Sequence, residues 1–190
     1  MNYLSNFVPD LERTDQTAPE NVYGVFDEQL EDLVWFAAFL VAHRDLMDVC
    51  LLDAVNIVVR HPRFSKDPGT WTHRAVIESA IEMQQGRIAT LGSIYARRTC
   101  WHARHTAIEP EELKRLTIQC PETLTRLDTL CRFALALRNV EDLSTAECAA
   151  MLHVSQAAVE NAYCAGVEIL TGIASQLAEF EDECQPADCR

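Results

Sequence analysis

Apolar residues recur at helical spacing along the first half of the chain. Over residues 27–42, apolar side chains fall three and four positions apart, which predicts a helix with a wide buried face. The same spacing predicts a helix over 46–60, with Asp45 as its N-cap, and another over 70–85. These three helices together predict a first helical module.

The second half of the chain repeats this pattern. Residues 87–105 form a further helix candidate that is rich in Arg and His, and Pro110 lies where a short helix begins. A stripe of leucines predicts one helix over 122–137, with Asn139 as its C-cap. A final helix is expected to continue to about Phe180.

Between these two helices the sequence predicts a helix-turn-helix. Ser144 and Glu147 have the spacing of a capping box, in which a hydroxyl and a carboxylate bond to each other's backbone amides. The first helix is expected to end at His153, a residue type that tolerates left-handed backbone better than most. Ser155 is then a good N-cap for the second helix.

The small and branched residues of this segment fit two helices that cross steeply. Ala149 lies ten residues before Val159. The small Ala149 would let the two helix backbones approach closely, and the branched Val159 would fill the space between them. A plain helical hairpin without a role in DNA binding has the same spacing. Spacing alone therefore leaves both interpretations open.

Composition places the whole chain in the all-α class. It has 190 residues, 48% hydrophobic and 24% charged, with only six glycines, and no strand-like alternation with turn residues. The expected organisation has five parts. These are an irregular acidic tail (1–26), a helical domain (27–85), a basic connector (86–119), a helix-turn-helix domain (120–180) and an acidic tail (181–190).

The N-terminus and the cysteines indicate a cytoplasmic protein. The first fifteen residues lack the basic start and apolar core of a secretory signal, and the most apolar run, 33–42, is too short to span a bilayer. The eight cysteines contain no C-x-x-C pair. Cys131, Cys148 and Cys164 fall on apolar helix faces and are expected to be buried thiols in a reducing compartment.

Charge is distributed in a way that conflicts with the helix-turn-helix. The net charge is −13, yet residues 60–105 hold eight basic residues against three acidic ones. Residues 143–170 contain no Lys or Arg, although duplex DNA binding depends on cations that neutralise phosphates. The central basic segment is either an anion-facing surface or a set of ordinary solvated arginines.

Three segments carry a resemblance to a known family. The run CPETLTRLDTLCRFALALRNVEDLSTAECAAMLHVSQAAVENAYCAGVEIL is similar to a C-terminal domain with a V-S-x-x-x-V recognition helix. RDLMDVCLLDAVNIVVRHPRF resembles a polymerase-binding helix, and WTHRAVIESAIEM resembles the helix that faces the −10 promoter element. Together they resemble the extracytoplasmic-function sigma factors of bacterial RNA polymerase. The resemblance implies region 2-like and region 4-like domains, with RNA polymerase core and promoter DNA as partners.

The resemblance also implies roles for individual residues. The recognition helix would present these residues to the −35 duplex: Ser155, Gln156, Ala157, Glu160, Asn161 and Tyr163. The −10 element would face Trp71, His73 and Arg74. The polymerase core would contact Asp45, Asp48, Leu52, Asp53 and Asn56. No catalytic residue, metal or cofactor is implied.

The chain departs from the family's pattern at the positions that matter for binding. The family carries Lys or Arg in its recognition helix, where this chain has Glu160, Asn161 and Gly166. Leu52 and Val55, or their neighbours, stand in place of the usual Gln and Phe of the polymerase-binding helix. An alternative is therefore a sigma mimic that keeps the fold, does not bind DNA and binds an anti-sigma factor or another regulator.

A third hypothesis is a metal protein or enzyme. Cys100, His102 and His105 lie close together, and zinc takes such ligands, but a structural site needs a fourth, for which only Cys120 is near. No Ser-His-Asp order, phosphate-binding glycine loop or close acid pair is present. The sequence therefore favours a transcription protein that is not an enzyme.

Overall fold

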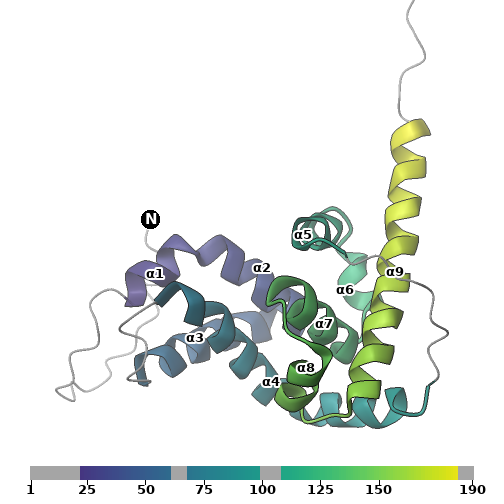
Figure 1. Ribbon diagram of the computed structural model, residues 1–190. Helices are drawn as coiled ribbons and strands as arrows, with labels where there is room; N and C mark the ends of the chain where they lie inside the picture. Colours follow the sequence, from purple (N-terminus) through teal and green to yellow (C-terminus); the bar gives the residue numbers. More distant parts are fainter. Residues whose placement is uncertain (1–21, 61–67, 99–107, 184–190) are drawn as a thin grey trace, which may run out of the picture. The chain divides into compact units, whose positions relative to one another are not determined.

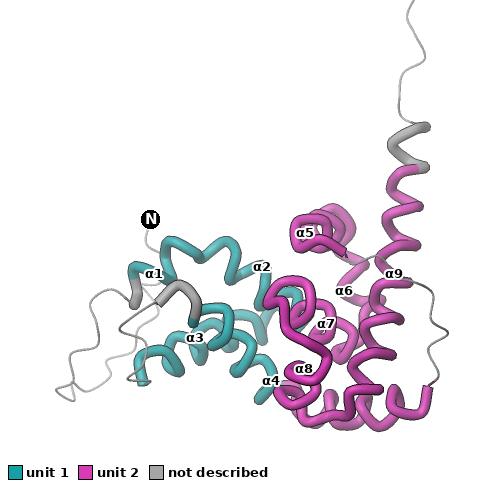
Figure 2. The backbone as a smooth tube through the Cα atoms, viewed as in Figure 1, with its two compact units in different colours: residues 1–83 teal, residues 84–190 magenta. Residues whose placement is uncertain are grey.

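The computed structural model describes residues 22–60, 68–98 and 108–183. Every regular element in these ranges is a helix, which confirms the all-α prediction (Figure 1). The chain divides into two compact units, residues 1–83 and 84–190, here called the first and second unit. The division falls within one helix, α4 (Pro68–Tyr95), which contributes its first part to one unit and its last part to the other (Figure 2).

The described part of the first unit contains α1 (Val22–Glu28), α2 (Leu30–Val41), α3 (Arg44–Arg60) and the beginning of α4. Its core includes Phe26, Leu33, Phe36, Ala37, Phe39, Leu40, Cys50, Ala54, Val58, Val76 and Ile77. These residues recur three and four positions apart, so each helix buries one face. A hydrogen bond of 2.6 Å from the Thr72 hydroxyl to Gln29 Oε1 joins α4 to the junction of α1 and α2.

Two helix starts in this unit differ from the sequence prediction. The irregular segment expected through residue 26 ends earlier, because α1 begins at Val22 and buries Phe26. Asp45 is not the N-cap of α3, because the helix begins at Arg44 and holds Asp45 within its first turn. A carboxylate there still favours the helix through its interaction with the positive end of the helix dipole.

The second unit is assembled around α7 and α9. It contains the end of α4, then α5 (Pro110–Gln119), α6 (Glu122–Arg126), α7 (Thr129–Leu135), a π-helical turn η2 (Ala136–Val140), α8 (Thr145–Leu152) and α9 (Gln156–Glu183). Helices α7 and α9 approach closely at Gly166, where a Cβ atom would lie 2.8 Å from Leu135 Cδ1. Gly166 is therefore required for packing against α7.

The single helix expected over 122–137 is wrong, because the chain breaks between α6 and α7. Leu127 and Asp128 are extended, and Asp128 Oδ1 accepts the backbone N–H of Cys131 at 2.9 Å, so Asp128 is the N-cap of α7. The buried Arg132 guanidinium donates to the carbonyls of Leu124 and Leu127. These carbonyls lose their helical partners at the break, and Arg132 satisfies them instead.

The end of α4 is part of the second unit rather than a connector. Residues 86–119 were expected to join two modules, but Ile88 and Tyr95 on α4 and Leu113 on α5 are buried. Gly92 lies against the side chain of Val154, and a Cβ atom at Gly92 would be 2.5 Å from Val154 Cγ1. Helix α4 therefore touches the turn that precedes α9.

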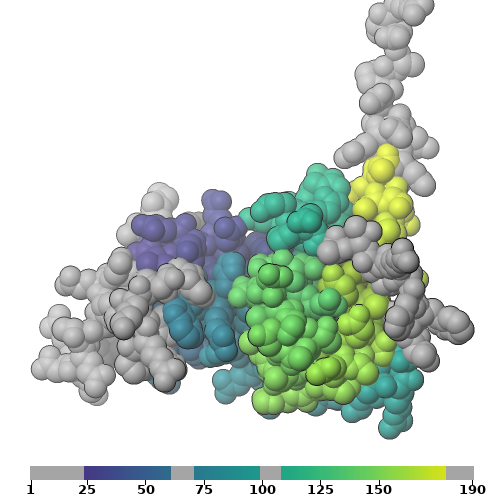
Figure 3. All heavy atoms as spheres, in the orientation of Figure 1, coloured from purple at the N-terminus to yellow at the C-terminus, as the bar shows by residue number. Residues whose placement is uncertain are grey.

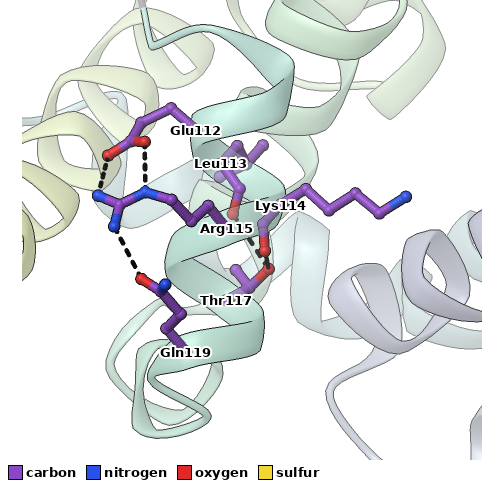
Figure 4. A network of polar contacts seen from close by, with 6 residues as sticks. All are labelled: Glu112, Leu113, Lys114, Arg115, Thr117 and Gln119. Carbon is purple, nitrogen blue, oxygen red and sulfur yellow. Dashed lines mark hydrogen bonds and ion pairs between the residues drawn. The ribbon is translucent and has the colours of Figure 1, made fainter.

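Helix α5 carries a local polar network on its exposed face (Figure 4). The Arg115 guanidinium donates two hydrogen bonds of 2.8 Å to Glu112 and one of 2.8 Å to Gln119. These pairs lie three and four residues apart, so they support the helix itself. Within the part of the chain that the structure describes, no helix is long and apolar enough to cross a membrane.

The two glycines of α4 give a matched test of this packing. We expect Gly86→Ala to raise the free energy of unfolding, because nothing lies within 4 Å of an added Cβ and alanine favours the helix by about 1 kcal/mol. Gly92→Ala gains the same propensity but pushes against the stiff Val154 side chain, at a cost of about 1–3 kcal/mol. Urea unfolding followed by circular dichroism should separate the variants by that cost. Equal stability would show that α4 does not pack on the turn.

Candidate nucleic-acid interface

Helices α8 and α9 form the predicted helix-turn-helix. Ser144 Oγ accepts the backbone N–H of Glu147, and Glu147 Oε2 accepts the N–H of Ser144 at 2.9 Å, which confirms the capping box. His153 ends α8 in the left-handed region, with φ 53° and ψ 40°. Ser155 Oγ accepts the N–H of Ala158 at 3.2 Å and caps α9, as predicted. The α8 segment lies on the visible face of the second unit (Figure 3).

The first turn of α9 presents an exposed polar surface. Ser155, Gln156 and Ala157 are exposed, while Ala158 and Val159 are buried beneath them. Side chains at the N-terminal end of a recognition helix are those that reach base edges in the major groove. Gln156 has the donor and acceptor that can pair with adenine.

Glu160 is exposed but held by its neighbours. Its Oε2 accepts from Thr145 Oγ1 at 3.2 Å and from Arg138 Nη1 at 3.3 Å. The Arg138 guanidinium also lies 4.1 Å from the ring centroid of Tyr163. Glu160 therefore joins α9 to the start of α8 and to η2, and its charge is partly compensated within the unit.

Two residues expected on the DNA-facing surface have structural roles instead. Tyr163 is buried, so its predicted exposure is wrong, and its hydroxyl donates to Asn139 Oδ1 at 3.0 Å. Asn139 itself lies within η2, so it is not the C-cap that the sequence predicted. Asn161 Nδ2 donates to the carbonyl oxygens of Tyr95 and Arg98 at 2.8 and 2.7 Å. Asn161 therefore fastens α9 to the end of α4.

The end of α4 is also fastened to α7 through Tyr95. Its hydroxyl donates to Asp128 Oδ2 at 2.7 Å and lies 3.2 Å from Cys131 Sγ. Burial raises the pKa of Tyr95 and raises the pKa of Cys131 to about 12, so both groups stay neutral at physiological pH. The phenol thus keeps the proton that it donates to Asp128.

Folding brings arginines beside the recognition helix. Residues 143–170 contain three glutamates and no Lys or Arg. Arg138 contacts α9 through its ion pair with Glu160. The exposed Arg97 and Arg98 follow α4 at the point where Asn161 bonds to the Arg98 carbonyl. Sequence position hides this proximity, because Asn161 and Arg98 are 63 residues apart.

The residues expected to contact a polymerase form one face of α3. Asp45, Asp48 and Leu52 are exposed, with Leu52 at 39% and the neighbouring Val49 at 51% exposure. Their positions repeat at intervals of three and four, so they share one side of the helix. Asp53 and Asn56, the other two expected residues, are half-buried on α3. Val49 and Leu52 are therefore an exposed apolar pair beside two acidic side chains.

The residues expected to face a −10 element lie near the start of α4 with different environments. Arg74 is exposed, with its guanidinium 5.9 Å from the Trp71 ring centroid and 3.4 Å from Glu78. The His73 ring instead stacks on the buried Phe36, with centroids 4.8 Å apart. Trp71 and Arg74 therefore form a surface pair, whereas His73 packs against the core of the first unit.

The cysteines divide into buried thiols and candidate metal ligands. Cys131, Cys148 and Cys164 are buried free thiols, as predicted. Cys100, His102 and His105 lie outside the described residues. Among the residues that the structure does describe, no group of three or more His, Cys, Asp or Glu side chains is arranged to hold a metal ion.

Comparison with known proteins identifies the helix-turn-helix. Residues 121–170 match the family described as sigma-70, region 4. The matched segment contains α6, α7, η2, α8 and the first part of α9, as far as Leu170. No curated protein and no solved structure matches the chain. The match supports the resemblance to sigma factors on this segment, which contains the helix-turn-helix of α8 and α9.

The role of Asn161 is tested by its removal. We expect Asn161→Ala to lower the free energy of unfolding by about 1–3 kcal/mol, because two backbone carbonyls lose their donor. Gln156→Ala is the matched control on the same helix, and its exposed side chain should change stability by less than about 0.5 kcal/mol. Chemical denaturation measures both. Equal small effects would mean that Asn161 does not hold α4.

The left-handed backbone of the turn is tested at His153. Glycine adopts this region without strain, whereas a β-branched residue is strained there. We expect His153→Gly to be more stable than the parent chain, and His153→Val to be less stable, by about 1 kcal/mol in each direction. Thermal unfolding reports the order. A stable His153→Val variant would contradict the turn geometry.

Proposed function

We propose that this protein is a sigma-factor-like transcription initiation protein that binds RNA polymerase core and promoter DNA in the cytoplasm. The observation that supports this most strongly is the region 4 match over residues 121–170, together with a helix-turn-helix whose caps and left-handed turn are all formed. The exposed end of α9, with Gln156 and Ala157, would read the −35 duplex.

The acidic and apolar face of α3 supports the polymerase-binding half of the proposal. Val49 and Leu52 form an exposed apolar pair, and Asp45 and Asp48 lie beside them. Such a surface suits a partner with an apolar groove and a basic rim. The surface pair of Trp71 and Arg74 would face the single-stranded −10 element, where an aromatic ring can stack on a base.

Tethering explains how a helix-turn-helix without its own cations can work. Once the α3 face is bound to polymerase, promoter binding by the second unit becomes an intramolecular step with a high effective DNA concentration. A weak reader of the −35 duplex is then sufficient. Polymerase supplies the affinity, and α9 supplies the choice of sequence.

A sigma mimic that binds only proteins is the second candidate. The observation that favours it is the absence of Lys and Arg from residues 143–170, where phosphate contacts are usually made. In this case the protein would bind an anti-sigma factor or another regulator through the same exposed apolar surfaces. The two candidates differ in promoter-dependent transcription, which the mimic lacks.

The proposal is tested by capture of purified bacterial core RNA polymerase on the immobilised full chain. We expect Val49→Ala with Leu52→Ala to weaken capture by about tenfold or more, because both side chains are exposed apolar anchors. Glu78→Ala with Glu82→Ala, two exposed changes on α4, is the control and should leave capture unchanged.

Transcription from a library of genomic promoter fragments then separates the two candidates. Core polymerase with the parent chain should produce specific transcripts, and Gln156→Ala should change which fragments are used. Capture without any specific transcript would contradict the initiation role. No capture of core polymerase would contradict the polymerase-binding half of the proposal and favour the mimic.

A further inference from the structure

We propose that Arg97 and Arg98, which lie just after the last residue of α4, supply the phosphate contacts that the helix-turn-helix lacks. This inference rests on the proposed function, since it assumes that α9 enters the major groove of a duplex. Both arginines lie outside the matched segment 121–170, so they are an addition to the region 4 domain rather than part of it.

The first support is the rigid connection between these arginines and the recognition helix. Asn161 Nδ2 bonds to the carbonyl of Arg98 itself and to that of Tyr95, at 2.7 and 2.8 Å. Tyr95 is fixed in turn to Asp128. The backbone at Arg98 is therefore held on the flank of α9, one helical turn after the exposed Gln156 and Ala157.

The second support is the packing of α4 on the turn itself. Gly92 lies against Val154, the residue just before the N-cap of α9. The last turn of α4 therefore lies along the first part of α9, from Val154 to Asn161. In a helix-turn-helix complex the phosphate backbone borders the groove on both sides of this helix.

The third support is exposure and charge. Arg97 and Arg98 are both exposed, and the Arg98 guanidinium lies 4.8 Å from the Tyr95 ring centroid, which fixes its direction while its edge stays accessible. Arg138, by contrast, is engaged with Glu160 and Tyr163. Arg97 and Arg98 are therefore better placed to neutralise phosphates than Arg138, the cation nearest to α9 in sequence.

The test measures how DNA binding depends on salt. Binding of the full chain to a fluorescent 30-base-pair duplex of mixed sequence is followed by anisotropy over a series of KCl concentrations. Each phosphate contact contributes about 0.9 to the slope of log K against log salt. We expect Arg97→Gln with Arg98→Gln to reduce this slope by about 1.8 and to weaken binding about 30-fold at roughly 0.15 M salt.

A matched control removes the same charge elsewhere in the second unit. Arg115 and Arg126 are exposed on α5 and α6. Figure 1 shows these two helices beside the later part of α9, away from its first turn. Arg115→Gln with Arg126→Gln should leave the slope unchanged. Arg97→Lys with Arg98→Lys should retain it, because lysine also neutralises a phosphate. Circular dichroism melts of all three pairs check that each is folded.

Each outcome decides the inference. A loss confined to the Arg97 and Arg98 pair supports it. Salt-sensitive binding that survives their replacement, or that falls equally in the control pair, overturns it while leaving the proposed function intact. A parent chain without salt-sensitive binding overturns the inference, while polymerase capture and promoter-dependent transcription still test the proposed function.

Discussion

The attachment of α4 to the recognition helix is the contact on which the second unit's surface depends. Asn161 bonds to two backbone carbonyls at the end of α4, Tyr95 bonds to Asp128, and Gly92 accommodates Val154. Each contact joins a segment outside the region 4 match to one inside it. The exposed residues at the start of α9, among them Gln156, Ala157 and Glu160, include no Lys or Arg of their own.

The same contacts explain why this helix-turn-helix lacks cations of its own. Positions that would face a groove are partly used for packing: Asn161 holds α4 and Glu160 holds Arg138 and Thr145. Gly166 is buried against Leu135, so a long basic side chain there would displace α7. In the proposed arrangement, the charge of Arg97 and Arg98 leaves these positions of α9 free for their packing roles.

Features set by local sequence were predictable. The capping box at Ser144, the left-handed His153 and the N-cap at Ser155 each depend on a few adjacent residues, and all three were predicted. The buried Cys131, Cys148 and Cys164 followed from helical spacing alone.

Features set by distant partners were not predictable. Tyr163 bonds to Asn139, 24 residues away, and Asn161 bonds to Tyr95, 66 residues away. The family resemblance, which carries no information on these partners, placed both side chains on the DNA-facing surface. The break before Asp128 was missed for a different reason. The leucine stripe continues across it at helical spacing, and the loss of backbone bonds is compensated by Arg132.

The most direct measurement places α9 on promoter DNA. A photoreactive amino acid at position 157, where the native Ala157 is exposed, would be irradiated in a complex of the full chain, core RNA polymerase and a transcribed promoter fragment. A sigma-like reader predicts crosslinks to bases of one short duplex segment near position −35. Crosslinks only to protein, with transcription intact, would contradict entry of this helix into the groove.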